Sequence, residues 1–329
     1  MFKKINRNIV LSITTIASTF IILFAVIVGI SMVSFVNSDF INTVEKIAEI
    51  EASSLRLTLD NLKSDTIRLS LDKDIYDYID GNILNNDAKN RINTFAGTKG
   101  QLILGTSLYS TLNGVDPYYS NQIGGGATLN EIRKDGYIAS FIEVPSYTGS
   151  MFVAREYGIA SSYSGIHFDS RNCIFSLVQV VDTDLSNKGV IIVDISTASL
   201  YEQILTLAGY RYLDASFPII SSRSHVIKSI DEIDYDYTFL ANHPTDGKLN
   251  QLNEETYIIG NNLVDDCKLF FVIPSSNINV LVTGIVLADI AIALVLIGIS
   301  ATVALFLGKT VQKPLTKLKT KIDEQEFNQ

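Results

Sequence analysis

The sequence contains no tryptophan, two cysteines and three histidines in 329 residues. This scarcity excludes a small scaffold held by many disulfides, and it excludes a zinc module rich in Cys and His. Positive charge is also scarce, because 26 Lys and Arg stand against 35 Asp and Glu, which gives a net charge of −9. We therefore expect no nucleic-acid partner. Only 19% of the residues are charged and 47% are hydrophobic, which excludes a disordered chain.

The hydrophobic residues gather in two blocks, one near each end of the chain. The first, residues 9–35, carries no charge and follows a basic tail, residues 1–8. As a helix it can cross a hydrocarbon core of about 30 Å, whereas the apolar region of a cleaved signal peptide spans only about 7–15 residues. The second, residues 280–308, precedes a lysine-rich tail, residues 309–329. We therefore expect two transmembrane helices.

The charges around these blocks predict the topology. Basic flanks stay in the cytoplasm, so we expect a multi-pass protein of the cell membrane, in contact with the lipid bilayer, with both termini cytoplasmic and residues 36–279 outside. Asp289 is the one charged residue inside either block, and it shares a helical face with Ala293, Ser300 and Ala304. Such a face usually packs against other helices in a dimer or a bundle. The alternative is an acid near the outer interface, reached by water.

Helical periodicity begins where the first block ends. Between residues 36 and 80 one side carries apolar residues at steps of three, four and seven: Ile41, Val44, Ala48, Ala52, Leu55, Leu59, Leu62 and Leu69. This pattern predicts an amphipathic stalk helix of about 40 residues at the start of the outside domain. Its length favours pairing with a second copy, and packing on its own domain is a compatible alternative.

Strand patterns follow the stalk, rich in Val, Ile, Phe and Tyr and bounded by turn residues. In one expected module, residues 81–196, a polar loop at 82–93 precedes strands at 101–109, 137–144, 151–157, 173–182 and 189–195. Ser196 is a suitable N-cap for a helix over residues 197–207. A smaller module, residues 197–279, has expected strands at 210–214, 217–221, 255–260 and 267–273. The fold class is α+β.

This order of helix, sheet, helix and smaller sheet between two membrane spans resembles the double Cache sensor domain of bacterial receptors. The segment GVIIVDI at residues 189–195 resembles the strand that closes the membrane-distal module. The segment KLFFVIP at residues 268–274 resembles the strand that closes the membrane-proximal module. The resemblance implies an extracytoplasmic, PAS-like double module that senses a small molecule.

The cytoplasmic tail resembles the start of a HAMP linker, in which a proline follows the membrane helix and Pro-Leu-x-x-Leu opens a coiled coil. Pro314 is expected at a helix start, with Leu315 and Leu318 beginning the apolar seam. The alternative is a basic tail on anionic lipid. The resemblance implies the input half of a bacterial receptor, a homodimer that passes a signal inward through Asp289 and this linker.

The same resemblance leaves the output of the receptor open. A histidine kinase of a two-component system, outside this chain, is the expected output. The alternatives are the input module of a chemoreceptor or of a cyclic-dinucleotide enzyme, and a membrane-tethered binding or scaffold protein without signalling output.

The resemblance also implies a ligand site in the distal module. Asp194 matches an aspartate of the closing strand, and Arg155 with Tyr157 partly matches an Arg, Trp and Tyr group of amino-acid-binding members, although this chain has no tryptophan. Tyr109 is a further candidate. An arginine can fork onto a carboxylate and an aspartate can accept from an ammonium or hydroxyls, so the expected ligand is a carboxylate, an amino acid or a sugar. Core packing of the tyrosines, and a cap role for Asp194 beside Ser196, are the alternatives.

No pattern in the sequence predicts catalysis, a metal site or a cofactor, so we expect none of these. The histidines do not stand at ligand spacing, and the acidic pair Asp265-Asp266 is expected in a solvated loop. A disulfide between Cys173 and Cys267 is possible on an oxidising side of the membrane, but the double-module resemblance implies that they fall in late strands of different modules, too far apart to bridge. We therefore expect two buried free thiols.

Overall fold

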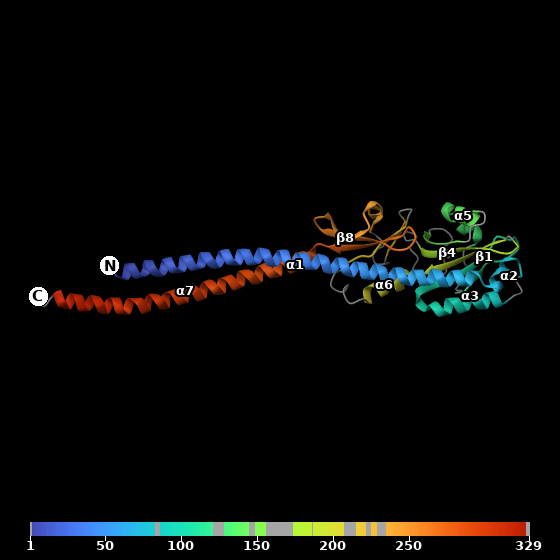
Figure 1. Ribbon diagram of the computed structural model, residues 1–329. Helices are drawn as coiled ribbons and strands as arrows, with labels where there is room; N and C mark the ends of the chain where they lie inside the picture. Colours follow the sequence, from blue (N-terminus) through green and yellow to red (C-terminus); the bar gives the residue numbers. More distant parts are fainter. Residues whose placement is uncertain are drawn as a thin grey trace. The chain divides into compact units, whose positions relative to one another are not determined.

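The structure is a computed structural model that describes residues 2–82, 86–120, 128–144, 149–155, 174–185, 187–206, 215–221, 225–228 and 235–326. The chain divides into two compact units (Figure 1). One comprises Met1–Asn42 with Ser276–Gln329, and the other is Thr43–Ser275.

The first unit consists of parts of two long helices, α1 (Phe2–Ser70) and α7 (Ser276–Glu326). Each contains a stretch long and apolar enough to cross a membrane, within Leu11–Ser70 and Val282–Thr310. The large apolar side chains of these stretches are exposed, as at Phe24 (66%) and Phe306 (70%), so the stretches are not the core of a soluble domain. These helices agree with the two predicted spans, and the crossing itself stays a prediction.

Pro314 does not stand at a helix start. It lies inside α7, which continues without a break from Ser276 to Glu326. A proline removes one backbone hydrogen bond, and a long helix can keep its course when the turns on both sides remain bonded. The prediction that Pro314 starts a new helix is therefore wrong.

The predicted amphipathic helix is confirmed by the second half of α1. Six of the predicted apolar positions are at most 3% exposed: Val44, Ala48, Ala52, Leu55, Leu59 and Leu62. The helix ends at Ser70, earlier than the predicted limit at residue 80, because Asp72 starts a new helix. Its carboxylate accepts from the N–H of Asp74 (2.9 Å) and caps α2 (Lys73–Ile79).

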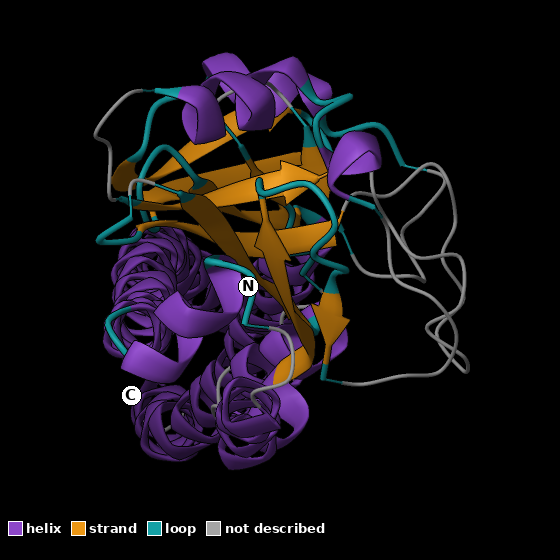
Figure 2. Cartoon of the chain, turned by 90° about the vertical axis from the view of Figure 1, so that its right-hand side faces the viewer, coloured by secondary structure: helices purple, strands orange, loops and turns teal. Residues whose placement is uncertain are grey.

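The first sheet has five antiparallel strands in the order β2-β1-β5-β4-β3. Its strands are β1 (Ile103–Ser110), β2 (Tyr118–Tyr119), β3 (Ser150–Arg155), β4 (Ile174–Asp182) and β5 (Lys188–Ile195). Helices lie on both sides of the strands (Figure 2). In Figure 1, α5 lies on one side of β1 and β4, and α3 lies on the other. The strands at 101–109, 151–157, 173–182 and 189–195 are confirmed within the described residues.

Two predictions around the first sheet are wrong. Residues 82–93 were expected as a loop, but α3 (Asn86–Lys99) starts there and buries Ile92 and Phe95. Residues 137–144 were expected as a strand, but they form α5 (Gly136–Glu143). The Asp135 carboxylate accepts from the N–H groups of Tyr137 and Ile138, which starts a helix despite the strand-like composition.

The second sheet also has five antiparallel strands, in the order β7-β6-β10-β9-β8. They are β6 (Ile219–Ile220), β7 (Val226–Ile227), β8 (Asp246–Asn253), β9 (Thr256–Asn262) and β10 (Lys268–Pro274). Between the sheets, α6 (Thr197–Thr206) confirms the helix predicted after Ser196, whose hydroxyl accepts from the N–H of Ser199. The short elements are α4 (Leu129–Ile132), η1 (Gly100–Leu102) and η4 (Thr238–Asn242). The expected strand at 210–214 lies outside the described residues.

The buried side of α1 carries one acid. Glu51 is only 3% exposed and lies beside Ala48, Ala52 and Leu55 in sequence and on the same buried face. Within the described residues its carboxyl forms no hydrogen bond or ion pair. Burial raises the pKa of Glu51 from its usual 4.5 to about 7.

Replacing this acid by its amide should stabilise the fold only at high pH. An acid whose pKa is raised in the folded state stabilises it fully below the unfolded pKa, and that contribution is lost as the pH rises through the folded pKa of about 7. We expect Glu51→Gln to raise the free energy of unfolding above that of wild type by up to about 3 kcal/mol at about pH 8. At about pH 4 the two free energies should be almost equal.

Urea unfolding of the full chain, followed by near-ultraviolet circular dichroism, measures this difference, because all 15 tyrosines lie between residues 43 and 275. Glu49→Gln on the exposed side of α1 is the matched control and should change nothing at either pH. A gain for Glu51→Gln that is equal at both pH values would contradict ionisation as its cause.

Candidate functional site

A polar cluster lies on the face of the first sheet that α4 and α5 cover. That face is mostly apolar, and its strands pack Val153, Val178 and Ile192 against Ile132, Ile138 and Ile142 of the two helices. Arg155, Ser176 and Asp194 come from β3, β4 and β5, which are neighbours in the sheet. Side chains of a strand alternate between its two faces, and each of the three residues is two positions from an apolar residue of this face. Arg155, Ser176 and Asp194 therefore lie on the same face of the sheet.

The three side chains are bonded to one another. Arg155 Nη2 donates to Asp194 Oδ1 (2.5 Å), and the hydroxyl of Ser176 donates to the same oxygen (2.6 Å). Arg155 Nε donates to the oxygen of Ser176 (3.2 Å). Both charged side chains are only 2% exposed, so this is an ion pair fully removed from water. Such a pair is costly to break by removing one partner, and it is a poor source of stability when intact.

Two tyrosines extend the cluster on β1 and β2. The rings of Tyr109 and Tyr119 meet edge to face, with centroids 6.0 Å apart. Burial, and to a smaller extent Tyr119, raises the pKa of the Tyr109 hydroxyl. The charges of Arg155 and Asp194 also act on that hydroxyl, in opposite directions, so it belongs to the same polar region. The phenol therefore stays neutral and can both donate and accept hydrogen bonds.

The structure thus brings together Tyr109, Arg155 and Asp194, and Tyr157 lies outside the described residues. Tyr109 is also part of the apolar core, as its alternative role required. The N-cap of α6 comes from Ser196 itself. Sequence reasoning missed Ser176, although a serine in a strand of Val, Phe and Leu, opposite Asp194 in register, was a usable signal.

Asp289 lies against α1 of the same chain. A Cβ atom at Gly29 would be 2.7 Å from Asp289 Oδ2, so a larger residue at this position would require the carboxylate to move. Both residues line a groove of about 740 Å³ between α1 and α7, and Ala304 of the predicted small face is 1% exposed. Leu315 and Leu318 follow in α7, and their predicted seam stays a prediction.

A turn of the second sheet is bonded to the edge strand of the first. Asp265, between β9 and β10, has a left-handed backbone (φ 47°). Its Oδ2 accepts from the backbone N–H of Phe152 in β3 (2.8 Å), and its Oδ1 accepts from Lys63 of α1 (2.7 Å). The Cys267 thiol lies 4.0 Å from the carbonyl oxygen of Phe152. Arg56 of α1 binds the same turn through the Leu263 carbonyl (2.9 Å).

This turn bears on two expectations. Asp265 and Asp266 lie in an exposed turn, as predicted, and the Asp265 side chain also binds β3 and α1. Cys267 is a buried free thiol, as predicted, and Cys173 lies outside the described residues. Burial raises the pKa of Cys267 to about 12, and the charges of Asp265 and Asp266 act in the same direction.

In the part of the chain that the structure describes, no group of three His, Cys, Asp or Glu side chains could hold a metal ion. The bonded cluster of Arg155, Ser176 and Asp194 holds no side chain placed to act as a nucleophile with a free base beside it. What the cluster can do is recognise charge and hydroxyl groups.

Comparison with known proteins gives the fold. No protein-family model matches the sequence, and no curated protein matches it significantly. The sensory domain of the Campylobacter jejuni chemoreceptor Tlp3 is 12% identical, with a TM-score of 0.50 over 75% of this chain and 98% of that one. The chain has the fold of a double Cache sensor domain.

Two further solved structures are similar to this chain. The Tlp3 sensory domain with isoleucine bound is 13% identical, with a TM-score of 0.50 over 75% of this chain and 97% of that one. The ligand-binding domain of the Pseudomonas aeruginosa amino acid chemoreceptor PctC, in complex with GABA, is 11% identical, with a TM-score of 0.48 over 72% and 99%. At 12% and 13% identity, the likeness to the two Tlp3 structures shows the fold and nothing about ligands.

Proposed function

We propose that this chain is the input half of a bacterial transmembrane receptor that senses an extracytoplasmic small molecule. The observation that carries the proposal is the buried cluster of Arg155, Ser176 and Asp194 in the first sheet of a double Cache fold. A buried, charged and hydrogen-bonded cluster inside an otherwise apolar layer is costly to keep, and binding is a reason to keep it.

The chemistry of the cluster favours a zwitterionic ligand. Arg155 can exchange its bond to Asp194 for a bidentate bond to a carboxylate, and Asp194 can then accept from an ammonium group. Tyr109 offers a neutral hydroxyl for a third contact. We therefore place an amino acid first, and a simple carboxylate or a sugar remains an alternative. Tyr157 keeps its proposed role as a fourth contact.

We propose that the signal passes from the distal module, residues 81–196, to the proximal module through hydrogen bonds between the two. Arg155 and Phe152 lie on the same edge strand, and Phe152 is bonded to the turn that begins β10. From β10, in the proximal module of residues 197–279, the chain passes directly into α7. Asp289, Pro314, Leu315 and Leu318 would carry the movement along α7 to a histidine kinase. A chemoreceptor, a cyclic-dinucleotide enzyme or a scaffold without output stays the alternative.

We further propose a homodimer that forms along α1. Ile50 and Leu57 of α1 are 60% and 63% exposed and stand seven residues apart. A heptad spacing places them on one line of the helix, as in a coiled coil. With residues 36–279 outside and both tails in the cytoplasm, the paired helices would lead into the lipid bilayer.

The test is a ligand screen on the full chain in lipid nanodiscs, with amino acids, carboxylates and sugars. A ligand at about 100 times its dissociation constant should add about 2.7 kcal/mol to the free energy of unfolding and raise the melting temperature. Asp194→Asn keeps the shape of the side chain and should remove the response, whereas Asp246→Asn on exposed β8 should keep it. Light scattering on the same sample should give the mass of a dimer. A folded chain that no compound stabilises would favour the scaffold.

A further inference from the structure

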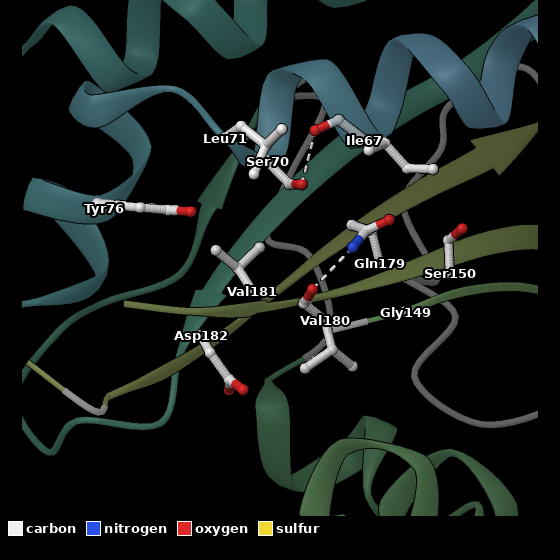
Figure 3. A pocket seen from close by; sticks show the side chains of 10 residues that line it. All are labelled: Ile67, Ser70, Leu71, Tyr76, Gly149, Ser150, Gln179, Val180, Val181 and Asp182. Carbon is white, nitrogen blue, oxygen red and sulfur yellow. Dashed lines mark hydrogen bonds between the residues drawn. The ribbon is translucent and has the colours of Figure 1, made fainter. Parts of the chain in front are cut away.

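A second cavity lies on the opposite face of the first sheet, away from Arg155 and Asp194. It has a volume of about 220 Å³ and is formed by the end of α1, by α2 and by the start of β3 with the end of β4 (Figure 3). In Figure 3, Gln179 and Val181 point from β4 toward the end of α1, and Tyr76 points into the same space from α2. Val180 and Asp182 point to the other side of the strand.

One polar atom of this cavity is without a partner. Gln179 is 3% exposed, and its amide nitrogen donates to the carbonyl oxygen of Val180 (2.7 Å). That bond fixes which end of the amide is the oxygen, and within the described residues Oε1 has no hydrogen-bond partner. A buried acceptor left alone costs about 1–3 kcal/mol, so a group that donates to it is favoured. The hydroxyl of Ser70 already donates to the carbonyl of Ile67 (2.8 Å).

The C-terminal end of α1 sets the electrostatic character of the cavity, because a helix terminus there carries a partial negative charge. Asp182 is the sole charged residue among those that line the cavity, and its carboxylate points to the other side of the strand. The helix terminus and the unpartnered Gln179 Oε1 disfavour a carboxylate or phosphate and favour a cation that donates hydrogen bonds. Ile67, Leu71 and Val181 supply apolar surface for a short hydrocarbon chain.

We propose that the cavity between α1, α2 and the β3–β4 edge is a second small-molecule site, which binds a short primary alkylammonium ion. The ammonium donates to Gln179 Oε1 and faces the end of α1, and its hydrocarbon part packs on the apolar walls. The site differs from the proposed sensor site in its face of the sheet, in its residues and in having no cationic side chain among the residues that line it.

The missing tryptophan makes a direct test available. Tyr76→Trp gives the full chain a single tryptophan at the wall of the cavity. In lipid nanodiscs, n-propylammonium chloride should change the fluorescence emission of this tryptophan, and the change should saturate as the concentration rises. Tyr235→Trp, at an exposed position outside the cavity, is the matched control and should show no change. The absence of a saturable change in Tyr76→Trp would overturn the proposal.

Three comparisons test the chemistry of the site. In the Tyr76→Trp background, Gln179→Leu should weaken propylammonium binding at least about tenfold, because a hydrogen bond to a charged group is lost. Leu71→Ala, at a position 67% exposed and so safe for folding, should weaken it several-fold. Sodium propionate and n-propanol should bind far more weakly than the amine. Equal binding of propionate, or unchanged affinity in both variants, would overturn the proposal.

A last variant separates this site from the sensor site. Asp194 is a buried carboxylate of the first sheet that an ammonium group could approach instead. With Asp194→Asn in the Tyr76→Trp chain, propylammonium should bind with unchanged affinity. Loss of binding in that variant would assign the amine to the sensor site and overturn the proposal of a second one.

Discussion

Arg155→Met is expected to lower the free energy of unfolding by about 3–5 kcal/mol, because it leaves the Asp194 carboxylate buried without its cation. Within the cluster, Asp194 would then accept a hydrogen bond from the hydroxyl of Ser176 alone. Its side chain is 2% exposed, so water does not replace the lost guanidinium. Methionine fills much of the volume of the arginine stem, so the loss comes from the charge and not from a cavity. The same variant should no longer bind a carboxylate ligand.

A double variant separates the structural role from the binding role. In Arg155→Met with Asp194→Leu both charges of the pair are removed together, so most of the lost stability should return, while ligand binding should stay absent. Urea unfolding and the ligand screen on the full chain measure the two effects. Arg91→Met is the control, because that side chain is 58% exposed and should cost at most about 1 kcal/mol. A double variant that still binds ligand would place the sensor site elsewhere.

The long helices and most strands were predictable because their residue patterns are long and local. The apolar stripe of α1 repeats over many turns, and the strands 174–182 and 188–195 are rich in branched residues between turns. The failures have local causes too. The segment that forms α5 is rich in residues typical of strands, such as Ile138 and Ile142. The signal that marks it as a helix is the N-cap at Asp135. The edge strand β8 is mostly polar, so no hydrophobic pattern marked it.

The candidate site was predictable only in part, because its contacts join residues that are distant in sequence. Arg155 and Asp194 were each proposed from a resemblance, but their direct bond depends on the strand order β5-β4-β3, which no local pattern states. The same limit applies to Asp265. Its neighbours in sequence suit a solvated turn, and its partners Lys63 and Phe152 are more than a hundred residues away.

Asp265→Ala should separate the edge strand of the first sheet from the turn that begins β10. The variant removes the acceptor of the Phe152 N–H and the partner of Lys63 in one step. The Cys267 thiol beside this turn then becomes accessible more often. In wild type it is 2% exposed, and a pKa of about 12 keeps it protonated, so its reaction with a disulfide reagent is slow. We expect the variant to react at least about tenfold faster at about pH 8.

The measurement uses a Cys173→Ser background, so that Cys267 is the only thiol. Asp266→Ala is the matched control, because Asp266 also raises the pKa of Cys267 but has no described bond to β3. If charge alone protected the thiol, both variants would react equally fast, and the link through Phe152 would be refuted.

The same thiol can report whether the link carries a signal. A ligand moves a two-state element only through its different affinity for the two states. If binding at Arg155 shifts β3, the shift reaches Phe152 within the same strand and then Asp265, so ligand should change the Cys267 rate in wild type. In Asp265→Ala the ligand should still bind, because Asp265 is not part of the sensor cluster, but the rate should no longer depend on it. If the ligand still changes the Cys267 rate in Asp265→Ala, the signal passes from the first sheet to β10 by another route. The next contact to test is then the hydrogen bond from Arg56 of α1 to the turn.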